Sequence, residues 1–244
     1  MTAGEMLIPN KMLKSATKGS LRSAALIAGI SLLIMVIAAP FAELYALPKL
    51  VVQSNAAETA KNIIENKTLF TAVLFGYLIT FICDVIVAWA LYVLLKPVND
   101  NLSLLTAWFR LVYTVIALVA LLNLVTVLRL VNTPDALTIF QPDQFNAQVM
   151  LFINTFRSNW NFGLLFFGIH LGLLGYLVFR SDYIPRILGV LLVVAGLGYL
   201  LTTLKPFLFP QSNLDFAEYT FYGELIFMLW LLIQGRKLQH PAVA

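Results

Sequence analysis

The stretch FICDVIVAWALYVLLKPVNDNLSLLTAWFRLVY (residues 81–113) contains two apolar runs separated by the short polar segment KPVNDN. Each run belongs to a longer apolar segment, and about 20 such residues suffice for a helix to cross a bilayer. The short turn predicts that the two helices are antiparallel neighbours in a membrane. Each arm nevertheless carries a full charge, Asp84 in the first and Arg110 in the second.

The composition agrees with a membrane protein. Of the 244 residues, 60% are hydrophobic and only 11% are charged, and the mean hydropathy is +0.87, which lies far from the values of soluble domains. The net charge of +4 comes from basic residues at the ends of the apolar segments. Because they form no basic and aromatic strip, we expect no nucleic-acid partner. The single Cys83 excludes an intrachain disulfide.

Six apolar runs predict an all-α bundle of six transmembrane helices. They cover about residues 24–47, 69–95, 104–131, 162–179, 187–204 and 219–233. The bundle is expected to occupy residues 23–235, between an N-terminal segment (1–22) and a C-terminal tail (236–244). The first run also has an alternative interpretation as a signal peptide, because lysines precede it and small residues lie near its end.

The distribution of basic residues predicts the orientation. Nine of the 16 Lys and Arg residues fall on the side of the N-terminus, six on the opposite side, and Arg110 lies within a span. Because basic loops stay in the cytoplasm, both termini are predicted to be cytoplasmic.

Two outer segments have helical patterns of their own. In residues 143–157 (DQFNAQVMLFINTFR), apolar residues recur every three or four positions, which predicts an amphipathic helix at the membrane interface before the fourth span. Residues 54–66 (SNAAETAKNIIEN) are expected to extend the second span outward. Either segment could cover a cavity or simply pack on the rim of the bundle.

Four titratable residues are predicted to lie inside the membrane. Asp84 is about 16 Å from the inner end of its span, near the middle of a core about 30 Å thick. Glu224 falls at a similar depth, His170 lies near the centre of the fourth span, and Arg110 is shallower. Because intramembrane charges usually face the bundle interior and pair, we expect Arg110 to neutralise Asp84 within one shared polar cluster.

This cluster leads to three hypotheses about function. In the first, it binds an ion, a proton or a small polar or amphipathic ligand: Arg110 keeps Asp84 ionised, and Glu224 and His170 exchange protons or contact the ligand. In the second, the cluster is a structural lock in a structural or partner-binding membrane protein. In the third, the chain is a membrane enzyme, with Asp84, His170 and Glu224 as weak metal-ligand candidates, although no His-x-x-x-His pair is present. No cofactor is predicted, and the expected partner is the lipid bilayer.

Several motifs resemble those of the bacterial domain-of-unknown-function family 4386. They are FAELYALPKLVVQSNAAETAKNI, DVIVAWALYVLLKPVNDNLSLLTAWFRLVY, GIHLGLLGYLVFRSDYIPRILGVLLVVAGLGYL and the GEL before FMLWLLIQG, together covering about residues 22–235. The resemblance implies a multi-pass protein of the bacterial cytoplasmic membrane and no particular activity. Glu43 and Tyr113 lie in these motifs and complete the set of ligand-binding candidates.

Overall fold

The computed structural model describes residues 10–133, 140–208 and 210–238. Parts of the two predicted terminal segments, residues 1–9 and 239–244, lie outside this description, and so does His240. Within the described ranges every regular element is a helix and no β-strand occurs.

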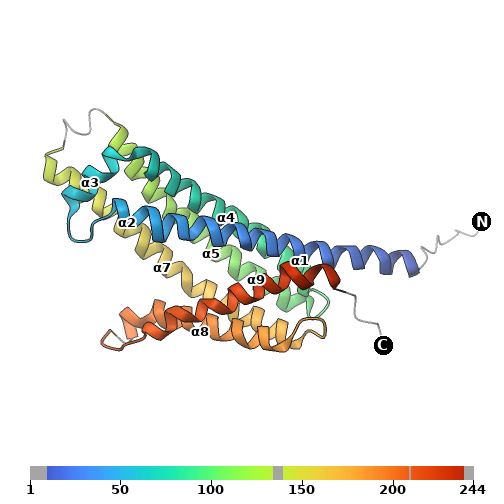
Figure 1. Ribbon diagram of the computed structural model, residues 1–244. Helices are drawn as coiled ribbons and strands as arrows, with labels where there is room; N and C mark the ends of the chain where they lie inside the picture. The colour runs from blue at the N-terminus through green and yellow to red at the C-terminus, as the bar shows by residue number, and fades with distance from the viewer. Residues whose placement is uncertain (1–9, 134–139, 209, 239–244) are drawn as a thin grey trace, which may run out of the picture.

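The helices are arranged lengthwise in a bundle, with α9 beside α1 and α8 (Figure 1). The α-helices are α1 (Asn10–Pro40), α2 (Leu47–Leu50), α3 (Ala56–Glu65), α4 (Lys67–Leu95), α5 (Asp100–Asn132), α7 (Pro142–Arg180), α8 (Arg186–Leu208) and α9 (Tyr222–Gln234). The π-helix η1 (Phe41–Ala46) and the 3-10 helices η2 (Asp215–Phe221) and η3 (Gly235–Lys237) complete the elements.

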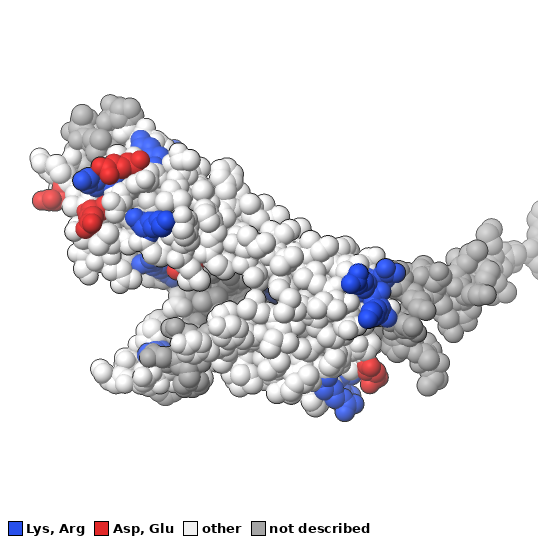
Figure 2. All heavy atoms as spheres, viewed as in Figure 1, with Lys and Arg blue, Asp and Glu red and all other residues white. Residues whose placement is uncertain are grey.

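Five of the helical segments are long and apolar enough to cross a membrane. They are Leu21–Leu50, Lys67–Leu95, Asp100–Asn132, Pro142–Arg180 and Arg186–Leu208. Many large apolar side chains on these helices point outward. On the face seen in Figure 2, charged side chains gather toward the two ends of the molecule and leave a broad uncharged belt between them. The part of the chain that the structure describes is thus all-helical and has the apolar helices of a membrane protein.

The hairpin formed by α4 and α5 has the short turn that the sequence predicts. Helix α4 ends at Leu95 and α5 begins at Asp100. The side chain of Asn99 accepts a hydrogen bond from the backbone N–H of Leu102 (2.9 Å), which caps one of the unpaired donors at the start of α5. The two helices pack against each other, so Asp84 and Arg110 belong to neighbouring helices.

The first span continues past a proline. Pro40 ends α1, and because its ring cannot donate a hydrogen bond and crowds the preceding turn, the helix widens there into the π-helix η1. Ala42 and Ala46 are buried where η1 packs on α4. Glu43, between these two alanines, is thereby brought close to α4.

The two outer segments differ from the predictions. No separate interfacial helix exists at residues 143–157: they form the first part of the 39-residue helix α7. The reason is that no Gly or Pro interrupts the chain between 143 and 162, and the predicted apolar face is buried within the protein instead of lying on the membrane surface. Residues 54–66 do not extend the second span: α3 ends at Glu65, and Asn66 (φ −121°, ψ 45°) redirects the chain into α4.

The sixth predicted span, about residues 219–233, is not one long α-helix. The chain there forms the 3-10 helix η2 followed by α9, which has only 13 residues. An α-helix of that length rises about 20 Å and is too short to cross the membrane core alone. The α-helix is short because residues 215–221, which precede it, form a 3-10 helix, which is wound more tightly than an α-helix.

Helices α7 and α8 approach very closely through glycine. A Cβ atom added at Gly175 would lie 2.6 Å from the carbonyl oxygen of Gly189, and one added at Gly196 would lie 2.7 Å from that of Gly168. Small residues permit such backbone contact between membrane helices. This packing fixes α7, and with it His170, between α5 and α8.

Candidate functional site

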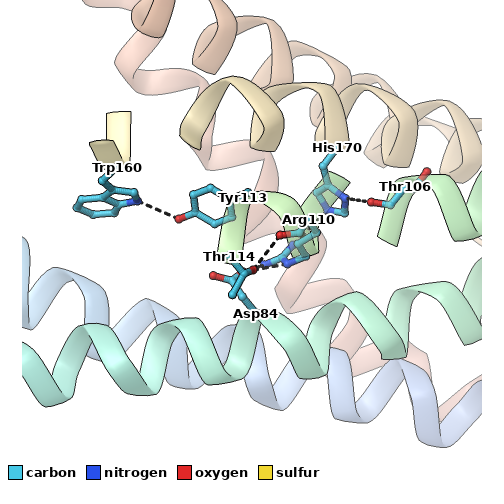
Figure 3. Close-up of polar contacts among 7 residues, drawn as sticks. All are labelled: Asp84, Thr106, Arg110, Tyr113, Thr114, Trp160 and His170. Carbon is cyan, nitrogen blue, oxygen red and sulfur yellow. Dashed lines mark hydrogen bonds and ion pairs between the residues drawn. The ribbon is translucent and has the colours of Figure 1, made fainter. Parts of the chain in front are cut away.

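A buried ion pair joins α4 and α5. The Nε of Arg110 donates to Oδ1 of Asp84 (2.9 Å), and Nη2 of Arg110 lies 2.6 Å from the same oxygen. Arg110 is 1% exposed and Asp84 is fully buried. Two nitrogens of the guanidinium thus face one carboxylate oxygen, as Figure 3 shows.

His170 connects this pair to α7. Its Nδ1 lies 2.8 Å from the backbone carbonyl oxygen of Thr106, and a carbonyl can only accept a hydrogen bond. Nδ1 therefore carries the proton, and Nε2 accepts from Nη1 of Arg110 (3.2 Å). With both ring nitrogens used in this way, the imidazole is neutral and orients the guanidinium (Figure 3).

The ion pair leaves hydrogen-bonding capacity unused. Oδ2 of Asp84 is buried and has no hydrogen-bond partner among the described residues. Nη2 of Arg110 also lacks a hydrogen bond of good geometry, although its short distance to Oδ1 makes it part of the ion pair. An unpaired buried carboxylate oxygen costs free energy, so this oxygen is a place where a water, a proton or a ligand group would be stabilised.

Glu224, in the first turn of α9, adds a second carboxylate to the centre. It interacts electrostatically with Tyr199 of α8 and with Arg110 and Asp84. Its side chain is only partly buried. The centre therefore contains two carboxylates and one guanidinium, which leaves one negative charge without a balancing cation when both acids are ionised.

Aromatic side chains surround the charged groups. The Nε1 of Trp160 donates to the hydroxyl of Tyr113 (3.0 Å), and the guanidinium carbon of Arg110 lies 5.3 Å from the ring centroid of Phe167. Tyr113 and Phe167 are themselves in contact, with centroids 4.8 Å apart. These rings shield the ion pair on the α7 side and keep its local dielectric constant low.

Glu43 lies apart from this centre and takes a different partner. The hydroxyl of Tyr77 donates to the Glu43 carboxylate, which joins η1 to α4. Tyr77 in turn contacts Trp160, with ring centroids 5.3 Å apart, and Trp160 bonds to Tyr113. A continuous line of polar and aromatic side chains thus runs from Glu43 toward Arg110.

A cavity of about 290 Å³ lies between α7, α8 and η2. Its lining includes Tyr199, which interacts electrostatically with Glu224. Figure 2 shows a hollow between the part of the molecule that carries α2 and α3 and the part that carries α8 and η2. Asp84 and His170 are enclosed, whereas Glu224 is only partly buried.

No metal site is formed by the weak metal-ligand candidates Asp84, His170 and Glu224. Among the described residues, no three His, Cys, Asp or Glu side chains are grouped so that they could hold a metal ion. The neighbours of His170 explain this. Both of its nitrogens already have protein partners, so a metal ion would have to displace Arg110.

The structure thus brings together Asp84, Arg110 and His170, with Tyr113 and Glu224 close by, and places Glu43 at the far end of the aromatic line. Sequence reasoning missed Tyr199, Tyr77 and Phe167. A helical-spacing criterion could have found two of them. Tyr77 precedes Asp84 by seven residues and Phe167 precedes His170 by three, so each shares a helix face with a charged residue. No sequence signal links Tyr199 to Glu224, because their contact depends on how α8 and α9 pack.

These features define a class: a multi-pass helical membrane protein with an ionic centre buried among its helices. The chain belongs to the family described as a domain of unknown function, DUF4386, whose model matches residues 27–235. An uncharacterised protein of Archaeoglobus fulgidus is 37% identical over 163 residues, which cover 67% of this chain and 83% of that protein. No solved structure matches the chain.

Proposed function

We propose that this protein binds a proton or a small cationic ligand at its buried ionic centre, in a binding or transport role. The observation that carries the proposal is the charge balance of Asp84, Glu224 and Arg110. A site with one carboxylate in excess, next to hydrocarbon, is stabilised by acquiring one positive charge. The unpaired Oδ2 of Asp84 supports the same conclusion.

The geometry divides the roles among the charged residues. Asp84 and Arg110 are enclosed and bonded to each other, so we assign them a fixed, organising role. Glu224 is partly exposed and interacts electrostatically with the phenol of Tyr199, so we assign it the exchange of the proton or cation. The groups that face it are Tyr199 from α8, Arg110 and Tyr113 from α5, and Asp84 from α4.

His170 receives a positioning role in this proposal. Protonation of Nε2 would place an imidazolium in contact with the guanidinium of Arg110, and two like charges this close repel strongly in a low-dielectric environment. We therefore assign proton exchange to Glu224 alone and the orientation of Arg110 to His170.

The proposed topology has six crossings with both termini in the cytoplasm of a bacterial cell. The sixth crossing consists of η2 and α9 in series, and the two together rise about 34 Å, which matches a membrane core about 30 Å thick. Arg236 and Lys237 directly follow α9, where the positive-inside rule favours the cytoplasmic side.

A structural lock is the second candidate function, and one observation favours it. Asp84, Arg110 and His170 join three helices through mutual contacts, which is what a lock requires. The two candidates differ in Glu224, because a lock has no use for a partly exposed carboxylate with no cation in contact.

Infrared spectroscopy of the reconstituted protein would separate the two candidates. We expect the band of a protonated carboxyl group at acidic pH that disappears on titration to alkaline pH. The band should be absent from Glu224→Gln and should persist in Asp84→Asn. Glu58→Gln, which removes an exposed carboxylate from α3, is the matched control.

Either of two outcomes would overturn the proposal. If no titrating band depends on Glu224, this carboxylate exchanges no proton. If the band disappears in Asp84→Asn and stays in Glu224→Gln, the roles of the two acids are reversed and the assignment is wrong.

A further inference from the structure

We infer that the cavity between α7, α8 and η2 binds a small organic cation with an apolar body, and that its positive group lies at Glu224 and Tyr199. The inference rests on the proposed function, because it names the ligand class for the same carboxylate. It adds a location for the apolar part of the ligand, which the charge balance alone does not provide.

The lining of the cavity combines apolar and hydroxyl-bearing side chains. The cavity has a volume of about 290 Å³, which is at the lower end of the range for small-molecule sites and far exceeds the space that a proton or a bare metal ion needs. The lining residues are Leu164, Tyr199, Thr202, Ala217, Thr220 and Phe221. A mixed lining of this kind suits an amphipathic molecule.

The cavity is connected to Glu224 through two elements. Tyr199 lines the cavity and interacts electrostatically with the Glu224 carboxylate. Thr220 and Phe221, which line the cavity from η2, precede Glu224 by four and three residues. In a continuing helical path, residues at this spacing lie on one side, so Glu224 lies on the side of the helix that carries these lining residues.

The chemistry around Glu224 favours a cation over an anion or a neutral molecule. Two carboxylates and one guanidinium leave a negative charge to be balanced. Tyr199 and Phe221 add aromatic rings, which attract ammonium groups. Thr203 lies one turn beyond Tyr199 on α8 and is buried, and its hydroxyl has no hydrogen-bond partner among the described residues. This hydroxyl is an unused hydrogen-bond acceptor on the same face of α8 as Tyr199.

The test measures the binding of benzyltrimethylammonium to the purified full chain in detergent by equilibrium dialysis. Benzyl alcohol serves as the neutral probe and benzenesulfonate as the anionic one. We expect saturable binding of the cation at one site per chain and none of the other two. Glu224→Gln should weaken the binding of the cation by about tenfold or more, because a close contact between charges is lost.

A second pair of variants separates this inference from the proposed function. Leu164→Trp fills the cavity and leaves Glu224 in place, so it should abolish binding of the cation and retain the titrating carboxyl band. Val119→Trp fills a separate apolar groove between α4 and α5 and should change neither.

The inference is overturned if benzyltrimethylammonium fails to bind saturably, if benzenesulfonate binds as well as the cation, or if Leu164→Trp binds the cation as wild type does. If the cation does not bind while the Glu224 band still titrates, the proton site stands and only the organic ligand is refuted. Loss of the Glu224 band would refute the proposed function itself.

Discussion

Removing Arg110 should be the most damaging single change to the buried centre. Arg110→Gln deletes both nitrogens that face Oδ1 of Asp84, at 2.9 and 2.6 Å, and the one that faces His170, at 3.2 Å. Because Oδ2 of Asp84 already has no partner, the carboxylate would be left buried and entirely unpaired. Breaking a buried ion pair in this way costs about 3–5 kcal/mol.

Removing the charge of Asp84 instead of that of Arg110 should cost less free energy of unfolding. In Asp84→Asn the amide oxygen can still accept from Arg110, and Glu224 remains near enough to offset the guanidinium charge. We expect a loss of about 2 kcal/mol, which is the contribution of a hydrogen bond that involves charged groups. In the double variant Asp84→Asn/Arg110→Gln neither charge of the ion pair is left behind, and the partly exposed Glu224 can take up a proton, so its stability should return to within about 1 kcal/mol of wild type.

The assay is the free energy of unfolding from a dodecyl sulfate titration in mixed micelles, followed by far-ultraviolet circular dichroism. The four proteins form a double-mutant cycle, which isolates the coupling between the two side chains. The reasoning is refuted if Arg110→Gln is no less stable than Asp84→Asn, or if the double variant loses the sum of the two single losses.

Three further predictions concern one glycine contact and two hydrogen bonds. Gly175→Ala should destabilise the protein by about 1–3 kcal/mol, because the added Cβ would lie 2.6 Å from a carbonyl oxygen of α8. Gly172→Ala is the control: its Cβ meets nothing within 4 Å, so its unfolding free energy in the same titration should equal that of wild type. Tyr183→Phe loses a hydrogen bond to the Leu94 carbonyl (2.6 Å) and should cost about 1 kcal/mol. Burial raises the pKa of Tyr183, so the phenol keeps its proton and that cost should be the same at neutral and mildly alkaline pH; a cost that vanishes there would contradict the assignment. Tyr77→Phe should cost about 1–3 kcal/mol by leaving the Glu43 carboxylate without its donor, and an unchanged unfolding curve would show that this bond contributes nothing.

The sequence was sufficient for the membrane class, the helical fold and the α4–α5 hairpin. These depend on local properties: the length of an apolar run, the absence of helix breakers and a polar turn of a few residues. The pairing of Asp84 with Arg110 followed from the hairpin, because a short turn makes its two helices neighbours. His170 was a candidate for the polar cluster only because of its predicted depth in the membrane. Its hydrogen bonds to Thr106 and Arg110 could not be predicted from its position in the chain.

Tertiary structure decided the remaining features. The apolar face of residues 143–157 suits a membrane surface as well as a protein interior, and only the packing of α7 on its neighbours placed it inside. The tight winding of η2 carries no apolar periodicity that distinguishes it from an α-helix. The proximity of Tyr199 to Glu224 and the cavity that Tyr199 lines depend on how α7, α8, η2 and α9 pack, and amino-acid order does not specify how separate helices are placed against one another. The sequence therefore predicted which charges enter the membrane, and the packing of the helices decided which of them are enclosed and which remain partly exposed.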